Sequence, residues 1–234
     1  MERKSGVLMH ISSMNGDYSI GSFGDEAKCF IDFLCEAGFS YWQVLPFCMV
    51  DECNSPYKSY SAFGGNPYFV DLNKLHKKGL ITDAELTEHR QHNPYVCEYV
   101  RLYHNRVKLL TEASKRVKDR EPIEKFIAES EHIAHFCEFM ALKEANNELP
   151  WLEWKIKEVN DEILFAWKFI QYEFFTQWAE IKEYANQKGI KIIGDIPIYV
   201  SLDSCDVWSN KSQYCLDEDG KPTLGAGVPP DYFS

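Results

Sequence analysis

The sequence predicts an α/β fold: the N-terminal part of a (β/α)8 TIM barrel with a helical insertion after the second strand. Residues 1–47 follow the order strand, loop, helix, strand, which is one unit of a parallel α/β sheet or barrel. A third apolar strand comes only after residue 189, behind a long helical tract. A complete barrel has eight strands in typically about 250 residues. Three strands in 234 residues therefore indicate either a small open sheet or the N-terminal piece of a longer protein.

Three short apolar runs account for the strands. The first, residues 5–11, contains Gly6 and ends before a pair of serines, and the second, residues 40–47, ends near Pro46. The third, residues 190–200, is continuous and apolar, as buried parallel strands are. Barrel enzymes carry their chemistry on the loops that follow the C-terminal ends of such strands, so we look for a site in those loops.

The segment between the first two strands has the signals of a helix. Asp25 and Glu26 place negative charge in the first turn, where the helix dipole favours it, and Gly38 is suited to a left-handed stop. Residues at helical spacing form one apolar face: Phe30, Phe33, Leu34 and Ala37.

The tract after the second strand is largely helical and sets the domain organisation that we expect. Helical periodicity covers residues 105–118, 123–145 and about 161–188, with breaks at Pro150 and Gly189. We expect three parts, namely the first barrel strands with an aromatic substrate loop (1–74), a mainly helical inserted subdomain (75–160), and a barrel helix, the third strand and its following loop (161–234).

Composition excludes several kinds of partner. The net charge of -11 argues against nucleic acid, which needs clustered Lys and Arg, and against an anionic membrane surface. No apolar stretch approaches the roughly 18 residues of a spanning helix, and the N-terminal apolar run is too short for a signal peptide. The eight cysteines form no CxxC pair. We expect them, including Cys29, Cys35 and Cys137, to be reduced and mostly buried residues of a cytoplasmic protein.

Residues 54–72, "NSPYKSYSAFGGNPYFVDL" (the aromatic loop), are too interrupted for a helix and unusually aromatic for a loop. Aromatic faces suit the C–H faces of sugar rings, and hydroxyls such as that of Ser55 can bond sugar hydroxyls. We interpret the loop as a carbohydrate platform, with Tyr57 and then Tyr60 as the candidates for ligand contact. The alternative is that the aromatic residues pin a long loop to the barrel rim, which is the interpretation we favour for Phe63.

Acidic residues follow the third strand. Asp195 stands within the apolar run "KIIGDIPIYV", a placement that is costly unless the carboxylate is hydrogen-bonded or ligand-bound. Asp203, taken alone, is more typical of a cap or turn than of a catalyst. The segment "LDEDGKPT", residues 216–223, lacks the ligand spacing of a calcium loop, and its Asp-Gly step favours a hairpin turn.

Other motifs give little. The pair of histidines in "HIAH", residues 132–135, would need a third ligand to hold a metal, so histidines on a helix surface are the better interpretation. No GxGxxG, Walker A, GxSxG or HExxH pattern occurs, which leaves nucleotide binding and a serine triad without support.

Five segments together resemble a known family. The chain is similar to the bacterial 4-α-glucanotransferases, also called amylomaltases or disproportionating enzymes, which are related to the α-amylase group. The resemblance is collinear from residue 5 to residue 234 and covers only the N-terminal part of that family's length. The segments are "SGVLMHISSMNGDYSIGSFGDEAKCFIDFL", "YWQVLPF", "SPYKSYSAFGGNPYFVDL", "IIGDIPIYVSLDSCDVW" and "LDEDGKPTLGAGVPPDYFS".

The resemblance implies a reaction of starch, glycogen and maltodextrin metabolism. An α-1,4 bond in a maltodextrin would be cut and the glucosyl segment moved to the 4-hydroxyl of another sugar, with retention of configuration. A carboxylate nucleophile and a second carboxyl, acting as acid and then base, would do this chemistry. The resemblance implies no cofactor.

Site residues follow by motif. Tyr57 matches the tyrosine of "SPY" that stacks on the sugar beside the cleaved bond, and Asp195 matches the aspartate of "GDIP" in the same subsite. Asp231 matches the aspartate of "PPDYFS", at the start of a loop over the acceptor side. Tyr103 fits a tyrosine that forms a remote glucan-binding site in some members. The usual partner of that tyrosine is replaced here by Glu52, a departure from the family pattern.

The resemblance also implies what is missing. The family's nucleophile, acid/base and third carboxylate follow later barrel strands, so we expect the nucleophile and the acid/base beyond Ser234, and no carboxylate of this chain matches a catalytic position. We therefore expect a segment with little or no transferase activity alone. Unpaired strand edges would also favour self-association. The alternatives are a non-catalytic maltodextrin-binding fragment, an α-glucan hydrolase of the same clan, and an unrelated small α/β domain.

Overall fold

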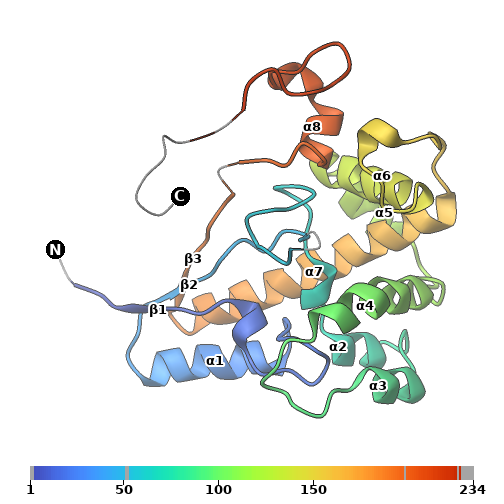
Figure 1. The fold of residues 1–234 in the computed structure, drawn as a ribbon. Helices are drawn as coiled ribbons and strands as arrows, with labels where there is room; N and C mark the ends of the chain where they lie inside the picture. The colour runs from blue at the N-terminus through green and yellow to red at the C-terminus, as the bar shows by residue number, and fades with distance from the viewer. Residues whose placement is uncertain (1–2, 51–52, 198, 226, 228–234) are drawn as a thin grey trace.

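A computed structural model describes residues 3–50, 53–197, 199–225 and 227. Its described strands form one parallel sheet in the order β1-β2-β3 (Figure 1). The strands are β1 (Gly6–Leu8), β2 (Tyr41–Gln43) and β3 (Lys191–Ile193). The predicted strand, helix, strand order and the late third strand are confirmed. The described residues thus form a small parallel sheet with helices, a partial α/β fold.

Each strand is shorter than the apolar run that predicted it. Backbone pairing continues only a little past the assigned ends, since Met9 N donates to Gln43 O and Val44 N donates to Ile193 O, both at 3.0 Å. Ile11 and Val44, in the first two runs, are buried beyond the strand ends. The third run differs, because Ile196 and Tyr199 are 78% and 64% exposed, so its predicted burial is wrong. An apolar run therefore located each strand but fixed neither its length nor, in the third run, its burial.

The two faces of the sheet differ. The middle row of the register, Val7, Trp42 and Ile192, packs into the core, and Trp42 is fully buried beneath the helices. The next row places Leu8 and Ile193 on the opposite face, where they are 55% and 44% exposed. One face is therefore covered by helices, and the other presents apolar side chains.

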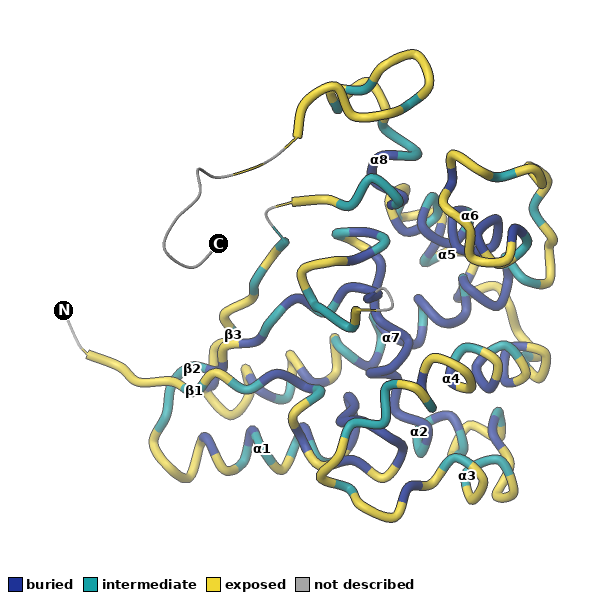
Figure 2. The backbone as a smooth tube through the Cα atoms, viewed as in Figure 1, coloured by how far each residue is buried: buried dark blue, intermediate teal, exposed yellow. Residues whose placement is uncertain are grey.

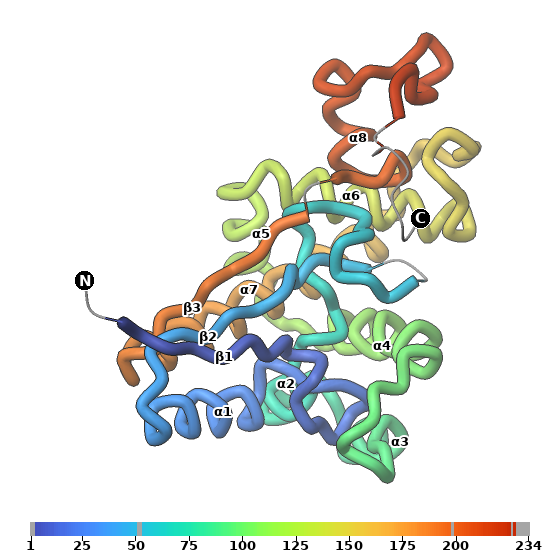
Figure 3. Tube along the Cα trace, turned by 60° about the vertical axis from the view of Figure 1, so that its left-hand side comes forward, coloured from blue at the N-terminus to red at the C-terminus, as the bar shows by residue number. Residues whose placement is uncertain are grey.

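Helices are the main regular elements in the rest of the described chain (Figures 1 and 3). The helices are α1 (Asp25–Glu36), α2 (Leu72–Lys77), α3 (Asp83–His89), α4 (Tyr99–Ser114), α5 (Glu121–Ala128), α6 (Glu131–Ala145), α7 (Asp161–Gln187) and α8 (Cys205–Ser209). Short 3-10 turns cover Ile11–Ser13, Pro67–Phe69, Trp151–Glu153 and Lys211–Gln213. The division of the chain at residues 74 and 160 remains a prediction.

Helix α7 is the central helix of the fold. It spans 27 residues and contacts α1, α4, α5, α6 and β3. Figure 2 shows its burial along much of its length. Asn160 begins the helix, because its side chain accepts hydrogen bonds from the backbone N–H groups of Glu162 and Ile163. The predicted bounds of about 161–188 are confirmed.

Two helix predictions need correction. The tract 123–145 is two helices, α5 and α6, because the backbone at Ser130 leaves the helical region at φ -137° and ψ 85°. Neither Gly nor Pro marks this break. The helix predicted over 105–118 is α4, which begins earlier, at Tyr99, and ends at Ser114.

The predicted apolar face of α1 is partly wrong. Leu34 is fully buried, and Ala27 and Ile31 are buried beside it, whereas Phe33 is 52% exposed. The buried face is therefore turned toward the 27–31–34 positions, and Phe33 lies at its margin, stacked on Phe30 with ring centroids 6.2 Å apart.

The cysteines are all free thiols, as predicted, but they are not mostly buried. Cys137 is buried, whereas Cys29 and Cys35 are exposed because they lie on the solvent side of α1. No helix among the described residues is long and apolar enough to cross a membrane.

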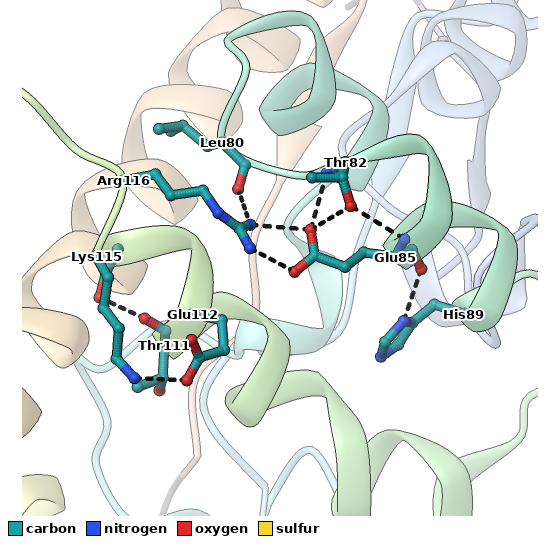
Figure 4. Close-up of polar contacts among 9 residues, drawn as sticks. Leu80, Thr82, Glu85, His89, Thr111, Glu112, Lys115 and Arg116 are labelled. Atoms are coloured by element: carbon teal, nitrogen blue, oxygen red, sulfur yellow. Dashed lines mark hydrogen bonds and ion pairs between the residues drawn. The ribbon is translucent and has the colours of Figure 1, made fainter.

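A polar cluster joins α3 to the end of α4 (Figure 4). Thr82 and Glu85 form a capping box at the start of α3. Arg116 donates to both carboxylate oxygens of Glu85, at 2.7 and 2.9 Å. These contacts hold the pKa of Glu85 well below its usual range, at about 2, with the Arg116 hydrogen bonds as the largest cause.

Candidate functional site

The aromatic loop and the end of β3 meet at the C-terminal edge of the sheet. Tyr57 Oη donates a hydrogen bond of 2.7 Å to Asp195 Oδ2. Figure 3 shows the segments after β2 and β3 lying near each other, and a backbone bond from Cys205 N to Tyr60 O, 2.8 Å long, joins them further out. Two residues predicted separately, 138 positions apart in the chain, therefore form one site.

The Tyr57–Asp195 pair combines an exposed ring with an oriented carboxylate. Tyr57 is 48% exposed, so its ring is available to a ligand. The hydrogen bond to Asp195 raises the pKa of Tyr57, so the phenol keeps its proton and donates. The second oxygen of Asp195, Oδ1, accepts from Ile196 N at 2.8 Å. Both carboxylate oxygens are thus oriented, while each keeps a lone pair for a sugar hydroxyl.

Ser55 shapes the tip of the loop, residues 54–60. Its Oγ accepts from Tyr57 N at 3.3 Å, and its carbonyl accepts from Lys58 N at 3.2 Å, which closes a turn. Ser55 therefore orients Tyr57 through the backbone. Direct contact between Ser55 and a ligand stays a prediction.

The base of the loop, residues 61–72, is fixed by close packing. Val50 pairs with Ser59, and Cys48 pairs with Gly65, as an irregular antiparallel ribbon. A Cβ on Gly65 would lie 2.2 Å from the ring of Phe174 on α7, so only glycine fits there. Gln171 on α7 clamps the same residue, because it accepts from Gly65 N at 2.7 Å and donates to Gly65 O at 2.9 Å.

Helix α8 holds the middle of the loop. Asp206 Oδ2 accepts from Ala62 N at 2.8 Å, and Ser61 Oγ lies 3.4 Å from Oδ1. Burial raises the pKa of Asp206, against the lowering effect of these bonds. The carboxylate of Asp206 is therefore occupied in holding the loop.

Sequence reasoning missed Lys143 of α6. Its side chain is 1% exposed and its ammonium lies 2.7 Å from Asp203 Oδ2. The ammonium also donates to the carbonyls of Glu148 and Leu149, and it lies 4.7 Å from the ring centre of Tyr60. The insertion, the loop after β3 and the aromatic loop thus share one buried cation. The sequence offered one signal for this role: a single Lys within the apolar helical segment "FCEFMALKEA", where a buried Lys requires a partner.

Asp203, predicted as a cap or turn residue, does not cap α8, where Ser204 is the cap; it makes contacts with other segments instead. Besides the Lys143 ion pair, its Oδ1 accepts from Trp151 N at 3.1 Å. The hairpin turn predicted in residues 216–223 is confirmed, since Asp217 N donates to Lys221 O at 2.8 Å and Gly220 has φ 79°.

The remaining candidates are not joined to the pair. Asp231, Glu52 and Ser234 lie outside the described residues. The expectation that the nucleophile and the acid/base follow Ser234 therefore stays a prediction. Tyr103 is 56% exposed on α4 and packs edge-on against His104. No described contact links Tyr103 to the Tyr57–Asp195 pair.

The "HIAH" histidines hold no metal cluster. Within the described part of the chain, no group of three or more His, Cys, Asp or Glu is placed to bind a metal ion. His132 instead stacks on Phe63, with ring centroids 4.3 Å apart and planes 8° from parallel. Phe63, predicted to pack, does contact α6 in this way, although its side chain is 49% exposed.

One family matches both the sequence and the fold. The sequence model described as 4-alpha-glucanotransferase matches residues 9–234. The chain belongs to this family. A 4-alpha-glucanotransferase of Clostridium butyricum is 43% identical over 244 residues, which cover 97% of this chain and 50% of that protein. The 4-alpha-glucanotransferase of Thermus thermophilus is 40% identical over 257 residues, which cover 100% of this chain and 50% of that protein.

Solved structures agree with this membership. The amylomaltase of Streptococcus agalactiae in complex with acarbose superposes with a TM-score of 0.93 at 38% identity, covering 100% of this chain and 51% of that one. The amylomaltase of Corynebacterium glutamicum has a TM-score of 0.67 at 16% identity and supports the fold alone. The chain spans about half the length of the curated relatives it matches.

Proposed function

We propose that these 234 residues form the glucan-holding wall of a 4-α-glucanotransferase that moves α-1,4-glucan segments between maltodextrins with retention of configuration. The Tyr57–Asp195 hydrogen bond carries the proposal. It presents an exposed aromatic ring and an oriented carboxylate at the C-terminal edge of a parallel sheet, where barrel enzymes bind their substrates. The amylomaltase of Streptococcus agalactiae is in complex with acarbose, which supports a sugar-like ligand for the site.

We also propose that the 234 residues alone bind maltodextrin without transferring it. A retaining enzyme needs two carboxyl groups about 5 Å apart, one acting as nucleophile and the other as acid and base. Two carboxylates that contact the aromatic loop or its neighbours are already occupied: Asp203 by Lys143, and Asp206 by Ala62. Asp195 is oriented by Tyr57, which suits it to hold a hydroxyl.

Binding and catalysis are tested separately. Calorimetric titration with maltotriose should show binding to the 234-residue chain. Tyr57→Ala should weaken that binding roughly tenfold, since large aromatic contacts commonly dominate recognition sites. Tyr95→Ala, at a tyrosine that is 83% exposed, is the matched control and should bind as the unaltered chain does. Equal affinity in all three proteins would refute the role of Tyr57.

Transfer is measured by incubating the chain with maltotriose and separating the products. We expect neither glucose nor longer dextrins. Glucose together with longer dextrins would refute the inactivity of the segment and favour a complete transferase site. Glucose and maltose without longer products would favour an α-glucan hydrolase.

The exposed face of the sheet supports a further part of the proposal, namely self-association. Leu8 and Ile193 are exposed at the two ends of one register row, with Gln43 of β2 between them, and Ile196 is 78% exposed just beyond β3. Apolar patches and open strand edges favour association. Sedimentation velocity should show dimers or larger species whose fraction rises with concentration, and Leu8→Lys with Ile193→Lys should reduce it.

A further inference from the structure

A small cavity lies beside the C-terminal end of β1. Its volume is about 110 Å³, which is room for more than one water molecule. Its lining mixes apolar side chains, such as Ile20 and Phe69, with polar ones, among them His10, Ser12 and Asn66. A mixed lining of this kind suits a ligand with both C–H and O–H groups.

His10 is the unusual member of this lining. Its residue is 8% exposed and its Nδ1 has no hydrogen-bond partner among the described residues. The rings of Phe47 and Phe69 lie on it, each with a centroid distance of 5.3 Å. Burial lowers the pKa of His10 to about 4, so the imidazole is neutral at physiological pH. A neutral imidazole has one donor and one acceptor nitrogen.

An unpartnered buried nitrogen calls for an explanation, because buried polar atoms in folded proteins almost always have a partner. The other such side-chain atom in the described part of the chain is Gln91 Oε1. Gln91 is anchored through its Nε2, which donates to the carbonyl of Gly16. Within the described structure, no hydrogen bond anchors either nitrogen of the His10 ring. The ring also lines the cavity.

The cavity lies close to the proposed glucan platform. Pro56, the residue before Tyr57, forms part of its lining. His10 follows β1 and Asp195 follows β3, with β2 between them. Two strand spacings amount to roughly 10 Å, so a glucan chain on Tyr57 can extend a hydroxyl-bearing group toward the cavity.

We propose that this cavity receives a hydroxyl-bearing arm of a glucosyl unit, with His10 Nδ1 as its hydrogen-bond partner. The inference rests on the proposed binding of glucan at Tyr57 and adds a second contact point to it. Because a sugar hydroxyl both donates and accepts, either neutral tautomer of His10 can serve. His10 is then a specificity residue of the glucan site, selecting for a sugar that carries a hydroxyl at this place.

The first test follows the His10 ring directly in the unaltered chain. Nitrogen NMR of the chain with labelled histidine follows the His10 Nδ1 resonance during titration with maltotriose, at pH 7. His10→Asn identifies that resonance by its loss, and the exposed His92→Gln serves as the matched control for assignment. We expect the His10 Nδ1 signal to move in step with binding, while the His92 signals stay in place.

The second test uses affinity. His10→Leu removes the polar atom and should weaken maltotriose binding roughly 3- to 10-fold, the loss typical of one hydrogen bond. His10→Asn places an amide near the position of Nδ1 and should restore most of the affinity. A structural role for the ring would not distinguish the two variants in this way, since both remove the packed imidazole.

The outcomes separate the two proposals. Tyr57-dependent binding with a stationary His10 Nδ1 signal, or with equal affinity in His10→Leu and His10→Asn, overturns the cavity inference and leaves the platform intact. No binding of maltotriose at all overturns the platform and the inference together. A His10 signal that moves with binding supports both.

Discussion

Residues 64–72, in the base of the aromatic loop, are all buried, whereas Tyr57 and Lys58 at its tip are exposed. In the base, Gln171 of α7 clamps Gly65, and Asp206 of α8 holds Ala62. At the tip, Tyr57 makes a single side-chain hydrogen bond, to Asp195. The contrast shows how a long loop can hold an exposed side chain in a defined position. The helices fix the base, and the ring of Tyr57 stays exposed, as the proposed glucan contact requires.

The comparison predicts that contacts behind the loop dominate stability, and the Lys143 junction should show the largest effect. Asp203→Ala leaves a buried ammonium without its carboxylate and should lower the free energy of unfolding by about 3 kcal/mol, the lower end for a broken buried pair because Asp203 is partly exposed. Urea denaturation measures this loss.

Two controls define that result. Asp219→Ala, which breaks an exposed pair with Lys221, should cost less than about 0.5 kcal/mol. Lys143→Met should cost less than Asp203→Ala, because the remaining carboxylate is 26% exposed and can reach water. A larger loss in Lys143→Met would contradict the assignment of the ammonium as the costly group.

The base of the loop provides the next largest effect. Gly65→Ala places a Cβ against the ring of Phe174 and should cost about 2 kcal/mol through overpacking. Gly225→Ala is the matched control, because no described atom beyond its chain neighbours lies within 4 Å of its added Cβ. Thermal unfolding of both variants tests the prediction. Equal midpoints would contradict it, and would mean that the ring of Phe174 can move aside for the added methyl group.

The Glu85–Arg116 contact, away from the loop, should contribute less to the free energy of unfolding than the two contacts above. Glu85→Gln in the cluster of Figure 4 removes a carboxylate held by Arg116 and should cost about 1 kcal/mol at pH 7, after allowing for its partial exposure. The folded pKa of about 2 lies below the usual 4.5. The contribution is therefore complete above pH 4.5 and is lost as the pH falls toward 2.

Denaturation of both proteins between about pH 7 and about pH 2.5 follows this difference. The stability curves of the unaltered chain and of Glu85→Gln should converge at the acid end. A gap that stays constant with pH would mean that the ion pair does not account for it.

The sequence predicted the parts of this structure that depend on local patterns. Helical periodicity and the stop at Gly189 gave α7 to within one residue, and the apolar runs located all the described strands. The break at Ser130 was not predicted, because no Gly or Pro marks it in the sequence. The exposure of Phe33 was not predicted either, because the covered face of α1 depends on α7, which comes more than a hundred residues later.

The sequence predicted the exposed residues of the candidate site but not the residues that pack behind them. Tyr57 and Asp195 each stood out through residue type and position, so their meeting could be expected from the parallel strand order. Gln171 and Lys143 were not predicted, because their roles exist only where helices from the later chain pack behind the loop. The unpartnered His10 nitrogen depends on the shape of a cavity, which no linear pattern reports.

The tip should respond least in stability and most clearly in binding. Tyr57→Phe removes one exposed hydroxyl and leaves the ring, so the thermal midpoint should match that of the unaltered chain, in contrast to Gly65→Ala. Maltotriose affinity should fall roughly 3- to 10-fold, because Asp195 loses the donor that orients it and the ligand loses one polar partner. Tyr95→Phe, at another exposed tyrosine, should change neither quantity. If Tyr57→Phe unfolds earlier than the control, the tip is a structural part of the loop, and the division between a fixed base and a free platform fails.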